Sequence, residues 1–412
     1  MQSRRHFLKT TALTTAAATL PAAAQTGDPI AALKNMASAA RPLEAADYQA
    51  RIERAQTLLK DAGWNALFVA GGTTLGYFTG TEWHLSERMF AAILPARGEP
   101  TWICPAFEEK RAMERIKIGA NRVRIWQEHE SPYELVRTTL KDLGVASGKV
   151  AIEPEVRHFV VDGLAQAAPA VAWVAGSRIS DGCRGVKTAK EVEYMRLANQ
   201  ITKKAFRTAL SMLREGMSEG ELGQIISRAH GALGARGYAG VGFGPTSAFP
   251  HGSVITRNLQ PGDIVLIDGG CSVQGYQSDV TRTTVFGKPS DKQRKLWDLI
   301  KKSQDAAAAV ARPGVRCEEL DRAARKVIEA AGYGPGYKYF SHRLGHGIGM
   351  DGHEYPYLVE GNKLPLAPGM SFSDEPGVYL HGEFGVRLED IIVVTESGVE
   401  FLGEKSSSIE EP

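Results

Sequence analysis

The first third of the chain alternates between amphipathic stretches and short apolar runs. Residues 48–62 place Ile52, Ala55, Leu58 and Leu59 along one face and are followed by Gly63, which predicts a helix. Strands are predicted at the apolar runs 66–70, 90–94, 101–104, 123–126, 150–152 and 171–174. Helices are predicted between the later runs, at 108–116, 132–143 and 157–168. We therefore expect a mixed α/β domain over residues 45–176.

A different pattern begins after a break at 177–187 that is rich in Gly, Ser and charge. Capping boxes that start at Thr188 and Ser218 predict two helices, which end near Arg214 and Ala235. Strand-like segments follow, and the same order then recurs, with strands at 263–268 and 279–285, helices at 291–311 and 318–331, and strands at 370–373 and 386–395. Over residues 187–403 we expect an α+β domain with an internal pseudo-repeat. Its antiparallel sheet would carry helices on the outer face and leave the concave face free.

Composition excludes several classes of protein. A chain of 412 residues suits two domains, and 43% hydrophobic with 23% charged residues is typical of a soluble globular protein. The net charge of +2 gives no electrostatic case for nucleic acid as a partner. No apolar run is long enough to form a membrane span.

The first residues have the features of an export signal. Arg4 and Arg5 precede Phe7, a mild Ala/Thr-rich stretch at 10–20, and the small residues 22–24 that a signal peptidase accepts. A frayed basic tail is the alternative interpretation, but the combination favours a twin-arginine signal peptide over residues 1–24. We therefore expect a periplasmic or secreted protein.

Four cysteines are too few for a disulfide scaffold, and their spacing fits no zinc-finger pattern. We expect buried free thiols at Cys104, Cys183, Cys271 and Cys317.

Two pairs of acidic residues lie at positions that hairpins would bring together. A hairpin centred between Val273 and Gln274 would place Asp268 directly opposite Asp279. Glu375 and Glu389 are likewise symmetric about a second turn, and a bulge would shift either register by one residue. Carboxylates this close repel unless a cation lies between them or one of them is protonated.

A histidine completes this group of candidate ligands. His346 lies among glycines at 345–349, which allow the backbone to approach another group closely. Four carboxylates and one neutral imidazole balance the charge of two divalent cations. The oxygen-rich set favours manganese, with cobalt, zinc and iron as alternatives. Paired metals of this kind share a water that becomes nucleophilic at neutral pH.

Six segments resemble the motifs of the M24 metallopeptidases, the group of aminopeptidase P, prolidase and methionine aminopeptidase. These segments are IDGG at 267–270, SDVTRT at 278–283, GHGIG at 345–349, HEYP at 353–356, DEPG at 374–377 and VRLED at 386–390. The resemblance extends from Lys187 to about Phe401 and implies the pita-bread fold. The first domain resembles the creatinase-type N-terminal domain.

The resemblance implies a role for each of the five candidate ligands. Asp268 would bind one metal, while Asp279 and Glu389 would bridge both. His346 and Glu375 would complete the shell of the first metal, with Glu375 also acting as general base.

Four further residues match positions near the substrate. His251 would lie close to the scissile bond, and His353 would stabilise the oxyanion. His342 and Arg387 would line the substrate pocket, although a purely structural role stays open for both.

The function implied is an exported dinuclear-metal peptidase that cleaves Xaa-Pro bonds by attack of a metal-bridging hydroxide, as aminopeptidase P or prolidase does. The segment from His353 to Pro356 is more similar to the proline-specific branch than to methionine aminopeptidases. Two alternatives are a hydrolase of another small amide, of the creatinase or ectoine hydrolase kind, and a non-catalytic peptide-binding protein. Retention of all five ligands argues against a metal-free enzyme and against a mere binding module. The substrate would be a peptide with proline at its second position, and the resemblance implies a homodimer or homotetramer.

Overall fold

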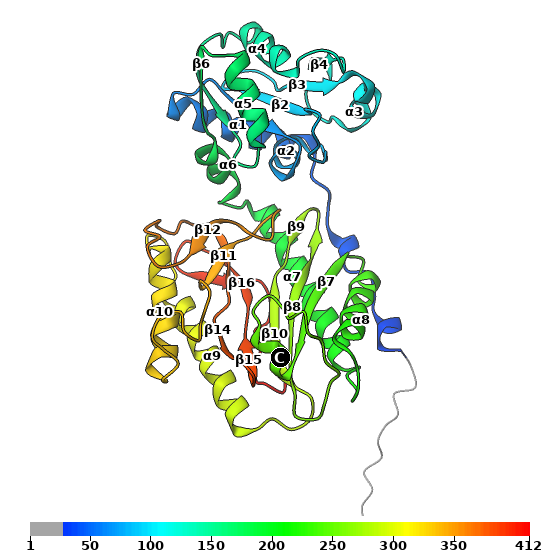
Figure 1. Ribbon diagram of the computed structural model, residues 1–412, viewed down its shortest axis with the longest axis vertical. Coiled ribbons are helices and arrows are strands. Elements are labelled where there is room, and N and C mark those ends of the chain that lie inside the picture. Colours follow the sequence, from blue (N-terminus) through cyan, green and yellow to red (C-terminus); the bar gives the residue numbers. More distant parts are fainter. Residues whose placement is uncertain (1–27) are drawn as a thin grey trace, which may run out of the picture.

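A computed structural model describes residues 28–412 of the chain and shows two domains stacked along the long axis of the molecule (Figure 1). The signal peptide expected at residues 1–24 lies outside the described residues.

The first domain is built on a mixed six-stranded sheet with the strand order β4-β3-β2-β1-β5-β6. All six predicted strands are present, as β1 (Ala66–Ala70), β2 (Ala91–Pro95), β3 (Thr101–Pro105), β4 (Val123–Trp126), β5 (Gly148–Ile152) and β6 (Val171–Ala175). The four predicted helices are also present, as α1 (Ala45–Ala62), α3 (Glu109–Arg115), α4 (Pro132–Asp142) and α5 (His158–Ala167). The sequence-based interpretation missed the short helix α2 (Thr73–Thr79).

Both faces of the sheet are buried at strands β1, β2 and β3, which explains why these strands are continuous apolar runs. Along β1, Leu67 and Val69 pack into one hydrophobic cluster, and Ala66 and Phe68 pack into another on the opposite face. This division follows from the two-residue period of side chains along a strand.

The break expected at 177–187 contains a helix, α6 (Ser177–Arg184). Ile179 and Cys183 lie one turn apart and are fully buried against the core that α1 covers. With only two core positions in a segment that is otherwise polar, this short helix leaves little periodic signal in the sequence.

The second domain contains three antiparallel sheets, of four, five and two strands, flanked by helices (Figure 1). In its first half, α7 (Ala189–Leu210) and α8 (Glu219–Ala232) precede β7 (Gly237–Phe243), β8 (Ile264–Val273), β9 (Tyr276–Gln277) and β10 (Val280–Val285). In the second half, α9 (Asp291–Val310) and α10 (Cys317–Ala330) precede β11 (Gly345–Gly347), β12 (Glu354–Leu358), β13 (Ser371–Asp374), β14 (Gly377–Leu380), β15 (Phe384–Arg387), β16 (Asp390–Val394) and β17 (Val399–Phe401). The expected pseudo-repeat of helices followed by strands is therefore present. A bridge between Thr281 and Glu389 connects strand β10 to the second half.

The register predicted for the first hairpin is wrong by two residues. Asp268 pairs with Thr281, and Val273 pairs with Tyr276, so the hairpin turns at Gln274 and Gly275. Both turn residues have positive φ, of 50° and 84°, as a two-residue hairpin turn requires. Asp268 and Asp279 are consequently diagonal neighbours on one face rather than direct partners.

The register predicted for the second pair is consistent with the structure. Asp374 pairs with Asp390 on one side and Gly377 pairs with Arg387 on the other, so Glu375 and Glu389 occupy matching positions between these pairs.

The four cysteines are buried and free, as expected. None of the helices within residues 28–412 is long and apolar enough to cross a membrane.

Candidate metal centre

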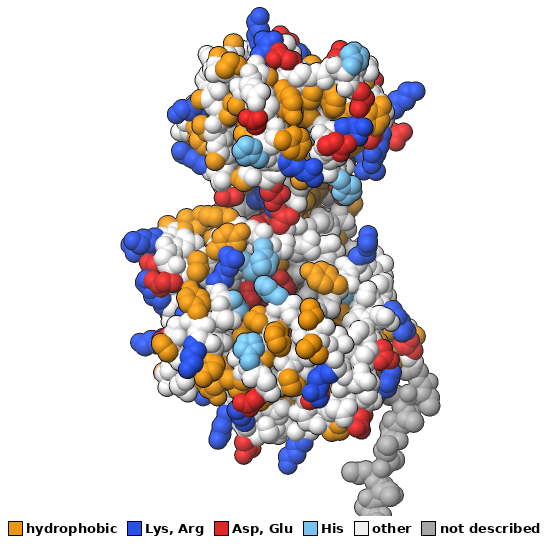
Figure 2. Space-filling view, in the orientation of Figure 1, with side chains coloured by type: hydrophobic (Ala, Val, Ile, Leu, Met, Phe, Trp, Pro, Cys, Tyr) orange, Lys and Arg blue, Asp and Glu red, His pale blue; other side chains and the backbone are white. Residues whose placement is uncertain are grey.

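A cavity of about 240 Å³ opens between the two halves of the second domain. Figure 2 shows histidine side chains over acidic ones in a hollow of this domain. All nine residues singled out in the sequence line the cavity, together with four others, Tyr238, Pro250, Gly269 and Arg343. The structure therefore brings every candidate site residue to one place.

The five candidate ligands come from five separate stretches of strand or strand end. Asp268 lies within β8 and Asp279 directly precedes β10, while His346 lies on β11. Glu375 follows β13, and Glu389 lies between β15 and β16. Ligand atoms of Asp268, Asp279 and Glu389 lie within 4.8 Å of one another, and so do those of His346, Glu375 and Glu389. Because Glu389 belongs to both groups, two cations could be held side by side with that carboxylate between them.

The electrostatics of the cavity favour cation binding. Burial and the neighbouring carboxylates Asp268 and Glu375 raise the pKa of Asp279 well above its usual range. The pKa of Glu389 is raised for similar reasons, by burial and then by Asp279 and Glu375. Burial also raises the pKa of Glu375 to about 7. So many buried carboxylates retain their charge only if cations offset it, and hard oxygen donors suit divalent metals.

His346 has the protonation state that a metal ligand needs. Burial, followed by the nearby His353, lowers its pKa to about 4, so the ring is neutral at physiological pH. Nδ1 lies 3.1 Å from the Gly347 carbonyl oxygen and therefore carries the proton. The lone pair of Nε2 then points toward the carboxylates, at 3.3 Å from Glu375 and 3.9 Å from Asp279.

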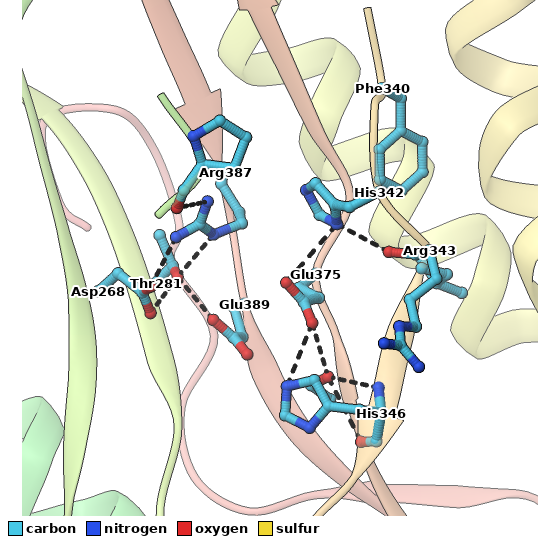
Figure 3. A network of polar contacts seen from close by, with 12 residues as sticks. Asp268, Thr281, Phe340, His342, Arg343, His346, Glu375, Arg387 and Glu389 are labelled. Atoms are coloured by element: carbon cyan, nitrogen blue, oxygen red, sulfur yellow. Dashed lines mark hydrogen bonds and ion pairs between the residues drawn. The ribbon is translucent and has the colours of Figure 1, made fainter. Parts of the chain in front are cut away.

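Arg387 holds the carboxylate of Asp268 rather than facing open solvent. Its guanidinium donates to Asp268 Oδ2 at 2.7 Å, to Thr281 Oγ1 at 3.0 Å, to the Pro250 carbonyl at 3.0 Å and to Tyr379 Oη at 2.9 Å. Figure 3 shows this group packed beside Glu389. With four contacts and only 3% exposure, Arg387 has little capacity left for a substrate.

Thr281 is the supporting residue that the sequence-based interpretation missed. Its hydroxyl lies 2.9 Å from Asp268 Oδ1 and 2.6 Å from Glu389 Oε2, so it connects carboxylates from both halves of the domain. It belongs to the SDVTRT segment, one residue beyond Val280, but only its contact with Glu389 reveals the role.

His342 also has both of its ring nitrogens engaged. Nε2 lies 2.7 Å from Tyr379 Oη, and Nδ1 lies 2.8 Å from the Arg343 carbonyl oxygen. Burial lowers the pKa of His342 to about 3, so the ring is neutral. Only the face of the ring is left to meet a substrate.

The remaining two histidines are at the exposed edge of the cavity. His353 stacks on His346 with ring centroids 3.5 Å apart, and His251 is exposed at the rim. Tyr238, which the sequence gave no reason to single out, lies on the same rim and is 73% exposed.

Comparison with known proteins agrees with this geometry. Residues 193–396 match the model of metallopeptidase family M24, residues 51–186 match the creatinase/prolidase N-terminal domain, and residues 1–21 match the signal sequence of the twin-arginine translocation pathway. A probable dipeptidase, PepE, from Mycobacterium tuberculosis is 35% identical over 366 residues, which cover 87% of this chain and 95% of that protein.

The chain belongs to metallopeptidase family M24.

Two further similarities lie within the same family. The Xaa-Pro dipeptidase of Lactobacillus helveticus is 34% identical over 355 residues, covering 84% of this chain and 95% of that protein. The crystal structure of dipeptidase PepE from Mycobacterium ulcerans superposes with a TM-score of 0.83 at 35% identity, covering 90% of this chain and 99% of that one. The M24 chain is thus a hydrolase of the metallopeptidase class, with a signal for twin-arginine export and a cavity suited to divalent metal ions.

Proposed function

We propose that this M24 protein is an exported peptidase that uses two divalent metal ions to hydrolyse Xaa-Pro bonds. The observation that carries the proposal is the pair of overlapping ligand groups, which share Glu389 and together contain Asp268, Asp279, His346 and Glu375. The names of similar proteins, which include Xaa-Pro dipeptidase, support proline as the residue after the scissile bond.

The metals supply a water of lowered pKa as nucleophile when they are bound, with manganese favoured by the oxygen-rich donors. Asp279 and Glu389 would be shared between the two ions, while Asp268, His346 and Glu375 would complete their shells. Glu375 lies 3.1 Å from the Ser373 hydroxyl and is placed to take up the proton that the nucleophile loses.

The histidines at the cavity edge act on the substrate. His353 is held by stacking on His346 and donates a hydrogen bond to the carbonyl oxygen of the residue before proline as negative charge develops there. His251, which lines the same cavity, would contact the proline side of the bond. The face of the His342 ring would pack against the proline ring.

Residues outside the cavity concern the location and assembly of the enzyme. Because a twin-arginine signal directs export, we propose that the mature enzyme works in the periplasm or outside the cell and that residues 1–24 are removed. We further propose two structural units, residues 45–176 and 187–403, and a homodimer or homotetramer as the working state.

Metal-loaded mature protein should be offered Ala-Pro, Ala-Pro-Ala and Ala-Ala in the presence of Mn²⁺ or Co²⁺. We expect the proline peptides to be cleaved and Ala-Ala to be a poor substrate. The Asp279→Ala variant removes a carboxylate that groups with Asp268 and Glu389 and also with His346 and His353, and it should lose turnover and metal while keeping its fold by circular dichroism. Absence of cleavage of both proline peptides by protein that holds two metals would disprove the assignment.

A further inference from the structure

The first hairpin of the second domain departs from a regular ladder directly before Asp279. Strands pair in one register on both sides of this point, which places Ser278 opposite Cys271. The Ser278 amide donates to the Cys271 carbonyl at 2.9 Å, as in a regular antiparallel pair. The Cys271 amide, however, donates to the Ser278 hydroxyl at 2.9 Å rather than to the Ser278 carbonyl. The hydroxyl therefore takes the place of the carbonyl in the ladder.

The carbonyl that leaves the ladder needs a glycine across from it. A Cβ at Gly270 would lie 1.8 Å from the Ser278 carbonyl oxygen, so a side chain at this position would collide with that carbonyl. This carbonyl belongs to the peptide group that leads into Asp279. The orientation of that peptide group, and with it the direction in which Asp279 leaves the strand, therefore depends on the bond made by the Ser278 hydroxyl.

The Ser278 hydroxyl is one end of a chain of hydrogen bonds that reaches two helices. Its Oγ lies 2.8 Å from Thr202 Oγ1 on α7, and Thr202 Oγ1 lies 3.2 Å from His230 Nε2 on α8. His230 Nδ1 lies 3.0 Å from the Ile226 carbonyl oxygen, which can only accept a hydrogen bond. Nδ1 therefore carries the ring proton, and Nε2 accepts.

The direction of every bond in the chain follows from this tautomer. Burial lowers the pKa of His230, which keeps the ring neutral. A hydroxyl has one proton to donate, so Thr202 donates to His230 and Ser278 donates to Thr202. Ser278 Oγ is then free to accept from the Cys271 amide, as observed.

Packing holds the chain in place. His230 and Thr202 are fully buried, and Ser278 is 5% exposed. The Phe206 ring meets the His230 ring edge to face, with centroids 6.1 Å apart. A Cβ at Gly237 would lie 2.4 Å from the His230 ring, so the ring is enclosed closely by the start of β7.

We infer that the chain from His230 through Thr202 to Ser278 positions Asp279 for metal binding. Without Thr202 the Ser278 hydroxyl loses its acceptor, and the ladder can close through the Ser278 carbonyl as in a regular strand. That closure would rotate the peptide group before Asp279. None of the three residues lines the cavity, so they are positioning residues that act through Asp279. The inference rests on the proposed function for the two metals, but not for the bond that is cleaved.

The test replaces the middle of the chain and uses Mn²⁺ alone as the probe on stripped mature protein. Thr202→Val keeps the shape of the side chain and removes the hydroxyl. Isothermal titration should show a loss of Mn²⁺ affinity of about 10- to 100-fold, the size expected for a group that orients a metal ligand. Because Asp279 would be shared by the two ions, the electron paramagnetic resonance spectrum of fully loaded protein should also show weaker coupling between them. Thr202→Ser keeps the hydroxyl and should behave as wild type in both measurements.

Two further variants separate positioning from stability. Gly237→Ala removes no polar group, but its methyl group would displace the His230 ring, and it should lower Mn²⁺ affinity by a similar factor. Ile328→Ala, in the core of the other half of the domain, should lower stability to urea and leave Mn²⁺ affinity as in wild type. If Thr202→Val loses stability but keeps its affinity and its spectrum, the chain is structural and the inference is overturned. An equal loss of affinity in Ile328→Ala would overturn it as well.

Hydrolysis of Ala-Pro by the same samples separates this inference from the proposed function. If wild-type protein with two bound ions does not cleave Ala-Pro, the proline assignment fails, while weaker Mn²⁺ binding by Thr202→Val than by Thr202→Ser still supports the chain. If Ala-Pro is cleaved and Thr202→Val binds Mn²⁺ as wild type does, the chain fails and the proline assignment stands. Absence of Mn²⁺ binding by wild-type protein overturns both.

Discussion

Thr281 and Glu389 form a β-bridge between the two halves of the second domain, and their side chains meet at 2.6 Å. The Thr281 hydroxyl also contacts Asp268, so a single small side chain orients two candidate ligands from opposite halves. The position of the halves and the geometry of the metal centre are therefore linked.

Replacement of Thr281 by valine keeps the shape of the side chain and removes the hydroxyl. We expect Mn²⁺ affinity to fall about 10- to 100-fold, because loss of a group that orients metal ligands has effects of that size. Isothermal titration with Mn²⁺ on stripped protein measures this, and Thr281→Ser should retain most of the affinity. Unchanged affinity in the valine variant would show that Thr281 does not orient the carboxylates. Thr57→Val, at an exposed helix position of the first domain, is the control.

Asp390 stabilises the fold behind the same bridge. Its Oδ1 accepts from Lys203 at 2.7 Å and from Arg282 at 2.8 Å, and all three side chains are buried. Asp390→Asn leaves two buried cations without their counter-charge and should lower the free energy of unfolding by about 3–5 kcal/mol. Urea denaturation measures the loss. Asp305→Asn, at a carboxylate that is 46% exposed, should cost less than about 1 kcal/mol.

The helix α6, which connects the two domains, contributes to the position of His353. Arg184, on α6, contacts Asp351 and lies 2.6 Å from Glu354. These two carboxylates lie on either side of His353 in the sequence, so Arg184 holds the segment that carries this histidine. Arg184→Met leaves both carboxylates without that partner, so we expect kcat on Ala-Pro to fall about 10-fold while two metals are still bound. Steady-state kinetics with metal analysis measures both. Arg178→Met, on the exposed side of the same helix, is the control, and equal kinetics in the two variants would contradict the proposed role.

The stability of metal-free protein should fall as the pH rises. The pKa of Glu375 is raised to about 7, and those of Asp279 and Glu389 are also raised, whereas a glutamate in an unfolded chain titrates near 4.3. The folded state thus binds more protons than the unfolded state between about pH 4 and pH 7, and this contribution to stability is lost across that window. The Tm difference between Mn²⁺-loaded and stripped protein should therefore widen from pH 5 to pH 8. In Glu375→Gln the stripped protein should show a shallower decline, and an equal decline would contradict the assignment to this group.

Much of the fold could be predicted because its signals are local. The apolar runs that become β1, β2 and β3 are buried on both faces, and the capping boxes at Thr188 and Ser218 are present as predicted. The α6 helix was not predicted, because only two of its side chains, Ile179 and Cys183, pack into the hydrophobic core. The register of the first hairpin depends on its two-residue turn at Gln274 and Gly275. The symmetric placement of Asp268 and Asp279 in the sequence does not determine where that turn lies.

The candidate site shows the same division. Motif spacing was sufficient to select all nine predicted residues that line the cavity. The supporting contacts were not predictable, because Thr281 meets Glu389 across 108 residues and Tyr379 meets His342 across 37.

The most direct test of the two-metal peptidase is a titration of stripped mature protein with Mn²⁺, in which bound metal and the rate of Ala-Pro hydrolysis are measured on the same samples. We predict that no hydrolysis occurs without metal and that the rate rises until two ions are bound per chain. Full hydrolysis without bound metal, or none when two ions are bound, would contradict this account.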